Sequence, residues 1–553
     1  MFHHTRLTQS IFTGSGAGFI LFAASALGGT WVSYDPALNW PVFLTILGSI
    51  ALFLIVTLLP PHWSMPGLII AAALVGLYFV SQYDHFYYPL EKGRLAQLGR
   101  FSGGLAPNLV FHTPHPNAVA GFLEGVFLLN LVLIWQTRGY KRWWWSLTFI
   151  IIAYALFISA SRGAWLAVAI AIGIWMLLYV PMRISQIIAL GMGLIISVMI
   201  GGVVALRLSN LSFLKSLPAT AATRLEIYIN SLFLFGDYPF TGIGPGDTFA
   251  MIYSRYQLLI NVPYYYYAHN LYLSIALAQG IGGLMALGLL LFALSRFVLR
   301  IEQTRLKTSS QNQTKQIFRV AWLGVTVSLI HGLTDAVQYS GDYWTMPMIF
   351  ALAGVVVAAG RQIKHQGAKM PGRKDLIISP LRLCSPAPWR LLILSIFAVT
   401  TIFFWRPLTA AWYANLGANY QTHAELSEVD QDTRERLLTQ AITSFNRALA
   451  LKPNHAVANR RLGMLALDRN EFETAVTYLE QSYAQEPHNQ ATLKALGYAY
   501  LWAGQLDLAE ELLRQVEFQS RLIGELNYWH WWWGAQGQKD LSSYSREMAN
   551  RLS

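Results

Sequence analysis

Three residues of the sequence have the chemistry for a group transfer: His269, Arg162 and Arg224. His269 stands at the start of a long apolar segment, where a titratable ring is costly unless it has a partner or a task. A near-neutral imidazole can take a proton from a hydroxyl nucleophile. Two guanidinium groups can hold a leaving diphosphate through paired hydrogen bonds. The three residues therefore suggest a site for a hydroxyl nucleophile and a diphosphate leaving group, if the fold brings them together.

Each of these residues also has a purely structural interpretation. Arginines near helix ends often extend their side chains to the membrane interface, which would account for Arg162 in Ser161-Arg162-Gly163. His269 could cap its helix or lie in the interface, and Arg224 could be a solvated charge in a loop. The elements that position the three residues must decide between these interpretations.

The composition indicates a membrane protein for most of the 553 residues. The chain is 54% hydrophobic and only 12% charged, whereas soluble domains carry about 25% charged residues. A spanning helix needs about 20 mainly apolar residues. We expect eleven spans, at residues 13–33, 41–60, 66–81, 116–136, 144–161, 163–180, 184–206, 269–295, 319–337, 343–360 and 390–407.

Lysine and arginine gather in alternate connections between these spans. The basic connections are residues 138–142, Arg183, residues 296–319 and residues 361–390. Because short loops rich in these residues stay in the cytoplasm, we expect a cytoplasmic N-terminus and an extracytoplasmic C-terminus. The outer loops are then residues 82–115 and 207–268, and Arg162, Arg224 and His269 all fall on the outer side.

The C-terminal part of the sequence repeats every 34 residues. The matched positions are Pro453 and Pro487, Leu462-Gly463 and Leu496-Gly497, and Ala475 and Ala509. This period and spacing resemble the tetratricopeptide repeat, a pair of antiparallel helices. We expect repeats at 455–488 and 489–522, after the remains of an earlier one at 434–454. They could bind a protein partner, join copies of the chain, or cover the membrane part as a lid.

The predicted fold is therefore all-α, with a helical membrane domain over residues 1–407 and an extracytoplasmic repeat domain over residues 408–553. The chain has a net charge of +12, in which a strongly basic membrane part is offset by a mildly acidic C-terminal part. Topology and lipid headgroups explain the excess of basic residues in the membrane part. We expect no nucleic-acid partner, because no basic stripe falls in a soluble fold. The single Cys384 excludes an intrachain disulfide. His112 and His115 have no evident third ligand, so we expect no metal and no cofactor.

Three further motifs remain open between structural and functional interpretations. His331 and Asp335, one helical turn apart, could pair inside the membrane or be packed polar groups, which we favour. The tyrosines at 264–267 could be an interfacial belt, which we favour, or a platform for sugar rings. The glycines of residues 242–246 follow no predicted strand, so a tight or re-entrant loop is a better interpretation than a nucleotide site.

Together, these motifs resemble the O-antigen ligase and O-antigen polymerase superfamily of bacterial envelope glycosyltransferases, over roughly residues 100–360. The most specific segment runs from His269-Asn270 through Gly280 to Gly283. Further segments that resemble the family are Ser161 to Trp165, Gly242 to Gly246, and Phe111 to Asn117. Arg224 is placed like the arginine of the family's outer loop. The terminal repeats are not part of the ligase core, although such repeats occur in relatives.

The resemblance implies a membrane fold of the GT-C type with its catalytic face outside. The donor would be a glycan on undecaprenyl diphosphate, transferred to a hydroxyl of a glycan, lipid or protein without metal. His269 would be the general base, Arg162 and Arg224 would bind the diphosphate, and Asn270, Gly280 and Gly283 would support the site. A polymerase or a protein O-oligosaccharyltransferase is the alternative within the superfamily.

Two functions of other classes remain to be compared. A transporter of lipid-linked sugars would place its ionisable residues near the membrane midplane and show internal repeats, whereas these residues cluster on one side. A non-catalytic scaffold built on the repeats would leave Arg162 and His269 without a role.

Overall fold

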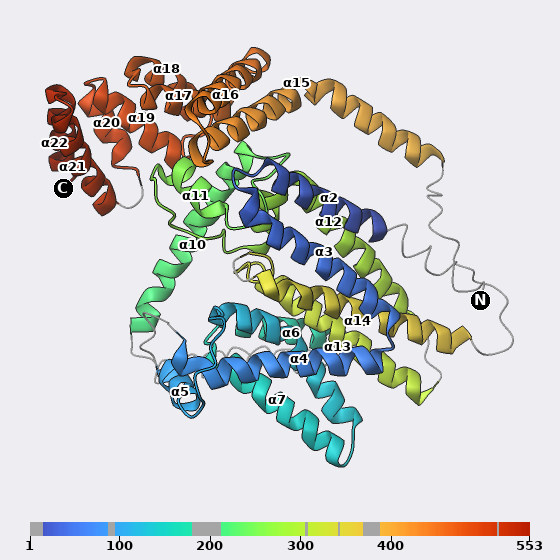
Figure 1. The fold of residues 1–553 in the computed structure, drawn as a ribbon. Helices are drawn as coiled ribbons and strands as arrows, with labels where there is room; N and C mark the ends of the chain where they lie inside the picture. Colours follow the sequence, from blue (N-terminus) through green and yellow to red (C-terminus); the bar gives the residue numbers. More distant parts are fainter. Residues whose placement is uncertain are drawn as a thin grey trace.

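The computed structural model describes residues 15–86, 94–179, 212–304, 308–340, 343–368, 387–516 and 519–553. In these ranges the chain forms helices and no strand, which confirms the predicted all-α class. The long helices of the body are α2 (Ser15–Val32), α3 (Pro36–Leu58), α4 (Pro61–Gln82), α6 (Pro116–Gln136), α7 (Tyr140–Ile158), α8 (Arg162–Tyr179), α12 (Leu271–Glu302), α13 (Ser309–His331) and α14 (Met346–Ala368). Figure 1 shows them side by side in the larger part of the molecule.

Among the described helices, six are long and apolar enough to cross a membrane. They are Pro36–Leu58, Pro61–His85, Pro116–Gln136, Arg162–Tyr179, Leu271–Glu302 and Tyr343–Lys364. Helices α2, α7, α13 and α15 (Ala387–Leu426) lie at four more of the predicted spans. The predicted span 184–206 falls outside the described residues, so the count of eleven stays a prediction.

The body helices pack closely where small residues face one another. At the crossing of α6 and α13, a Cβ atom added to Gly324 would lie 2.7 Å from the carbonyl oxygen of Gly125. Lipid tails are as apolar as the helices, so association of membrane helices depends on such close backbone approach. Large apolar side chains of α3, α4, α6, α13 and α14 fill the space around this crossing.

The region predicted as the long outer loop 207–268 contains regular structure. Its elements are α10 (Ser212–Asp237), α11 (Phe249–Tyr253) and the π-helical turn η2 (Ser254–Leu258). The other predicted outer loop contains the 3-10 turn η1 (Tyr83–His85) and α5 (Arg94–Gly103), and the 3-10 turn η3 (Tyr343–Thr345) precedes α14. Arg224 therefore stands on a helix and not in an irregular loop.

The C-terminal part forms paired helices, as the 34-residue period predicts. After α15 they are α16 (Gln431–Leu451), α17 (Ala456–Asp468), α18 (Phe472–Tyr483), α19 (Gln490–Trp502), α20 (Leu506–Leu513), α21 (Gln519–Ala535) and α22 (Lys539–Leu552). Gly463 and Gly497 have equivalent roles, because a Cβ atom on either would lie 2.5 Å from Leu479 or Leu513 of the paired helix. Figure 1 shows these helices, orange to red, gathered at one end of the molecule beside α11.

Helix α15 connects the two parts without interruption. It runs from Ala387 to Leu426 with Pro407 inside it, so the predicted domain boundary at 407/408 falls within one helix. Its last turns pack against α16 and belong to the repeat domain.

Candidate functional site

Helix α12 begins directly after His269 and is broken at Gly280. Asn270 is its N-cap, and the Asn270 side-chain oxygen accepts hydrogen bonds from the backbone N–H groups of Tyr272 (3.0 Å) and Leu273 (3.1 Å). This cap satisfies two of the N–H groups that a helix start leaves without a partner. His269 itself has a left-handed backbone with φ of 49°, a conformation that costs a non-glycine residue energy and is common at functional sites.

Asp335 draws His269 and Arg224 together. The turn that follows α13 carries Asp335, whose Oδ1 lies 3.5 Å from His269 Nδ1 and whose Oδ2 lies 3.8 Å from Arg224 Nη2. Asn117, at the start of α6, donates a hydrogen bond of 3.0 Å to the same Oδ2. The Asp335 side chain is 2% exposed, whereas those of His269 and Arg224 are 27% and 31% exposed. A buried carboxylate thus holds two partly exposed basic groups at the end of the helical body where α12 begins and α13 ends. We call this end of the body the mouth.

The charge state of Asp335 follows from these partners. Burial by itself raises the pKa of a carboxyl group. Here the nearby imidazole of His269, together with the charges of His331 and Arg224, outweighs burial and lowers the pKa of Asp335 to about 2. Asp335 is therefore a carboxylate at neutral pH.

Arg162 lies at the same mouth, as the first residue of α8. Its neighbour Gly163 packs against the turn after α13, because a Cβ atom there would lie 2.9 Å from His331 Nε2 and 3.1 Å from Thr334 Oγ1. Thr334 also accepts a hydrogen bond from Arg224 through its carbonyl oxygen. The guanidinium groups of Arg162 and Arg224 are near enough for their charges to interact. The structure thus brings together all three residues that the sequence singled out.

The backbone around His269 is tied to two other elements. Tyr228 of α10 donates a hydrogen bond of 2.7 Å to the His269 carbonyl oxygen. The backbone N–H of Leu271 donates to the carbonyl oxygen of Gly332 at 2.7 Å. The Tyr267 ring lies against the imidazole, with 4.3 Å between centroids. These contacts fix the position of the imidazole relative to Asp335.

The glycine-rich segment 242–246 fills the break in α12. At Gly280 the backbone has φ of 64°, and the two halves of the helix meet at a kink. The N–H groups of Ile243 and Gly244 donate to the carbonyl oxygens of Leu277 (2.7 Å) and Ala278 (3.1 Å). The N–H of Ile281 donates to the Pro239 carbonyl oxygen at 2.7 Å. A tight loop against a membrane helix therefore replaces the hydrogen bonds that the kink removes.

The glycines at the break are required by close backbone approach. A Cβ atom on Gly280 would lie 2.6 Å from the Phe240 carbonyl oxygen, and one on Gly283 would lie 2.6 Å from the Gln279 Cβ. Gly242, with φ of 66°, would place its Cβ 2.5 Å from the Ala278 carbonyl. Each of these distances is too short for a real Cβ atom, which explains the spacing of Gly280 and Gly283 after His269.

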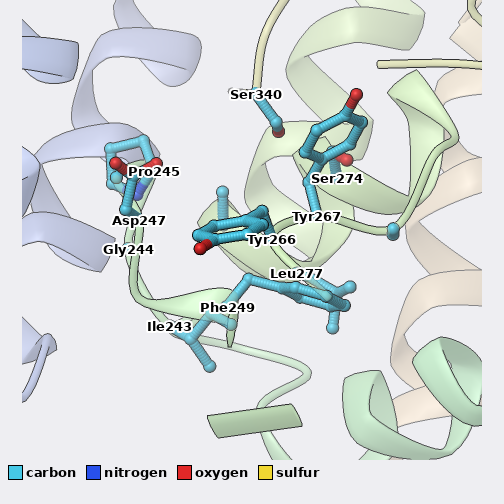
Figure 2. A pocket seen from close by; sticks show the side chains of 13 residues that line it. Ile243, Gly244, Pro245, Asp247, Phe249, Tyr266, Tyr267, Ser274, Leu277 and Ser340 are labelled. Carbon is cyan, nitrogen blue, oxygen red and sulfur yellow. The ribbon is translucent and has the colours of Figure 1, made fainter. Parts of the chain in front are cut away.

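A shallow pocket opens between this loop and the start of α12. Figure 2 shows Ile243 and Pro245 on one side and Tyr266, Tyr267 and Ser274 on the other. Its empty volume is about 320 Å³, including open solvent. Tyr266 is exposed at its edge. The sequence leaves tyrosines 264–267 open between an interfacial belt and a platform for sugar rings. In the structure Tyr267 packs against the His269 imidazole, and Tyr266 lines this pocket.

Sequence reasoning missed the acid of the site. The sequence leaves His331 and Asp335 open between an intramembrane pair and packed polar groups, the interpretation that we favour. In the structure His331 Nδ1 lies 2.9 Å from Glu124 Oε2, and both side chains are buried. Asp335 serves His269 and Arg224. Glu124 stands alone among the apolar residues of α6, and such a carboxyl inside a span is a signal for a buried partner. Asn117 lay within the recognised segment Phe111 to Asn117, but its contact with Asp335 could not be inferred from it.

A metal centre has no obvious place among the described residues. They contain no group of three or more His, Cys, Asp or Glu side chains arranged to hold an ion. The Nδ1 atom of His115 accepts a hydrogen bond of 3.2 Å from the N–H of Asn117 and so caps α6. The expectation of a metal-independent site stays a prediction.

Comparison with known families gives two matches along the chain. Residues 147–288 match the family model described as O-antigen ligase, a range that contains Arg162, Arg224, His269, Gly280 and Gly283. Residues 466–521 match the tetratricopeptide repeat. A comparison with curated proteins gave no significant match. The two family matches confirm the resemblance seen in the sequence: this chain carries an O-antigen ligase domain within a multi-pass membrane body and tetratricopeptide repeats in its C-terminal part, and the ligase match supports a membrane glycan-transfer role.

Proposed function

We propose that the protein transfers a glycan from a polyprenyl diphosphate, such as undecaprenyl diphosphate, to a hydroxyl acceptor. The observation that carries this proposal is the convergence of Arg162, Arg224 and His269 on one mouth, around the buried carboxylate of Asp335. The O-antigen ligase match over the same residues supports it. The apolar body offers the polyprenyl tail a lipid-like environment.

In this proposal His269 is the general base. Its Nδ1 faces Asp335, which leaves Nε2 to accept the proton of the acceptor hydroxyl. Asp335 is a positioning residue, since a carboxylate on one ring nitrogen selects the tautomer that has its lone pair on the other nitrogen. It also stabilises the imidazolium that forms, as the aspartate does in a serine protease triad.

The bond changes follow from these roles. The acceptor oxygen gives its proton to His269 and attacks the anomeric carbon of the donor sugar. The bond between this carbon and the diphosphate oxygen breaks, and the electron pair stays on the diphosphate. Arg162 and Arg224 then stabilise the additional negative charge through charge-assisted hydrogen bonds. Arg224 has five N–H donors, so its contacts with Thr334 and Asp335 are compatible with binding a phosphate as well.

The same proposal assigns the site to the outer face of the bacterial inner membrane. Alternate basic connections place the N-terminus in the cytoplasm and the repeats outside. The structure has the segment that leads to His269 in contact with the repeats, so both are on the same side of the body. A transporter is less well supported, because the basic groups gather at one mouth and not at midplane.

Substitution of His269 tests the proposal. Purified protein in nanodiscs, supplied with a lipid-linked oligosaccharide and a hydroxyl acceptor, should lose about 10²–10⁴-fold of its transfer rate in His269→Ala, the usual contribution of a general base. His488→Ala, which removes an exposed histidine of the repeats, should keep the wild-type rate. Turnover in His269→Ala within a few-fold of wild type would exclude His269 as the base.

A further inference from the structure

The repeats present one face, formed by α15, α17 and α19, to residues 237–260 of the same chain. We call this the inner face. Its most buried contact joins Asp237 to two successive arginines of α17. Arg460 and Arg461 both reach the Asp237 carboxylate, with 2.6 Å between Arg461 Nη2 and Asp237 Oδ2, and all three side chains are fully buried. Arg460 also pairs with Glu486 at 2.8 Å.

Two further contacts continue along this face. Arg255 of η2 lies 2.7 Å from both Glu425 of α15 and Asp468 of α17. Lys494 of α19 donates a hydrogen bond of 2.8 Å to the Leu258 carbonyl oxygen. The first helices of three successive pairs therefore each bind the segment, and acidic and basic groups face one another across the contact.

Apolar side chains complete the contact. The Arg461 guanidinium lies 3.5 Å from the centre of the Tyr256 ring, a favourable cation–π arrangement. Buried residues of the segment and of the repeats form a single hydrophobic cluster that includes Ile252, Tyr253, Met464 and Tyr498. A buried carboxylate without its arginines would be strongly unfavourable, so the inner face and the segment are built for each other.

The bound segment leads to the break in α12. The Oδ1 atom of Asn415, a buried residue of α15, accepts hydrogen bonds from the N–H groups of Phe240 (3.0 Å) and Thr241 (3.4 Å). Its Nδ2 donates to Thr241 Oγ1 at 3.0 Å. Directly before these residues, the Pro239 carbonyl oxygen accepts the N–H of Ile281. Asn415 therefore holds residues 239–241, which pack against the break of α12 at Gly280. The half of α12 that follows His269 ends at this break.

We propose that the inner face of the repeats is a binding site for the chain's own residues 237–260, and that Asn415 is a positioning residue that holds the first half of α12, and with it His269, in place. A protein partner of the repeats would then bind outside the inner face. The proposal rests on the proposed function only for its activity measurement, because its structural part is tested by hydrogen exchange.

Two matched pairs of substitutions in the full chain provide the test. Asn415→Ala removes the contact with Phe240 and Thr241. Its control, Asn454→Ala, removes an exposed asparagine whose side chain donates a hydrogen bond to Gln485 within the repeats. Arg255→Ala removes the ion pairs to the inner face. Its control, Arg551→Ala, removes ion pairs to Asp507, Glu510 and Glu547 that lie within the repeats.

Hydrogen–deuterium exchange and steady-state transfer kinetics are measured on the four variants and the wild type. Asn415→Ala should speed exchange at least about tenfold in peptides that cover residues 238–244 and 278–283, because the loss of a single hydrogen bond can already account for about that factor. It should lower kcat about tenfold and leave the KM for the lipid-linked donor within about twofold. Arg255→Ala should change both quantities in the same direction, and the two controls should match wild type.

Wild-type exchange in both peptides of Asn415→Ala would overturn the proposal. Equal changes in the Asn454→Ala control would overturn it as well, since they would show general destabilisation of the repeats. If none of the proteins, wild type included, transfers a glycan, the proposed function fails, and the exchange rates still decide the role of the inner face.

Discussion

Replacement of Asp335 by asparagine removes one charge from the candidate site at nearly constant shape. Asparagine retains an oxygen that can accept the hydrogen bond from Asn117, which is 3.0 Å long in the structure. It cannot form the ion pairs with His269 and Arg224. The substitution therefore separates the charge of Asp335 from its packing.

The size of the effect follows from the geometry. At 3.5 Å and an effective dielectric constant of about 20, a carboxylate and an imidazolium attract by roughly 4–5 kcal/mol. Water reduces this value, because the His269 side chain is 27% exposed. A remaining contribution of about 2.7 kcal/mol corresponds to a 100-fold loss of kcat. The analogous change in a serine protease triad costs about 10⁴-fold at a site that is better shielded.

The pH dependence gives a second measurement of the same effect. Loss of the Asp335 charge by acidification should have the same consequence as the Asp335→Asn substitution. In the wild type, the pKa of Asp335 is lowered to about 2, so the charge is present above the carboxyl's ordinary pKa of 3.8 and is lost only as the pH falls through about 2. Titration of Asp335 therefore contributes nothing to the pH dependence of the wild-type kcat between pH 5 and 9.

The assay is glycan transfer from a lipid-linked oligosaccharide by protein in nanodiscs, measured between pH 5 and 9. Glu124→Gln is the matched control, because it removes the other buried carboxylate–histidine pair, in which Glu124 Oε2 lies 2.9 Å from His331 Nδ1. We expect it to lower stability and to reduce kcat far less than Asp335→Asn does. A kcat for Asp335→Asn within about threefold of wild type across this pH range would refute the role of Asp335.

Two more predictions concern the helix break and the topology. Gly280→Ala should lower kcat at least about tenfold, since a Cβ atom there meets the Phe240 carbonyl oxygen and strained backbone of this kind costs about 1–3 kcal/mol. Gly288→Ala, on the same helix but with open space around the added Cβ, should be active, and equal loss in both would contradict the explanation. A reporter that is active only outside the cytoplasm should give signal when fused after Ser553. Signal from a reporter that works only in the cytoplasm would reverse the proposed orientation.

The sequence predicted the fold class and the basic residues of the site because their signals are local. Apolar length indicates membrane helices, and the 34-residue period indicates helix pairs, which the structure has from α15 to α20. His269, Arg162 and Arg224 each stand out as costly residues beside apolar segments. The predicted topology also placed all three residues on the same side of the membrane, because the ends of alternate spans lie on the same side.

The carboxylate of the site and the contact of the repeats could not be predicted in this way. Asn117 and Asp335 are 218 positions apart, and nothing in either segment identifies the other as its partner. The arginines of α17 read as ordinary charges of a soluble helix, whereas they are fully buried against Asp237. Such pairings depend on how distant elements pack, and that information is absent from periodicity and composition.

The break at Gly280 explains why the imidazole and the glycines are spaced as they are. A helix interrupted in a membrane loses backbone hydrogen bonds that no water replaces, so protein groups must supply them. Ile243, Gly244 and Pro239 do so, and the approach of their backbone requires glycine at 280. The half-helix between His269 and Gly280 is thereby fixed at both ends, by the cap of Asn270 and the turn of Asp335 above and by the loop below. A base that must meet both an acceptor and a diphosphate benefits from such a rigid support, because catalytic geometry tolerates little displacement.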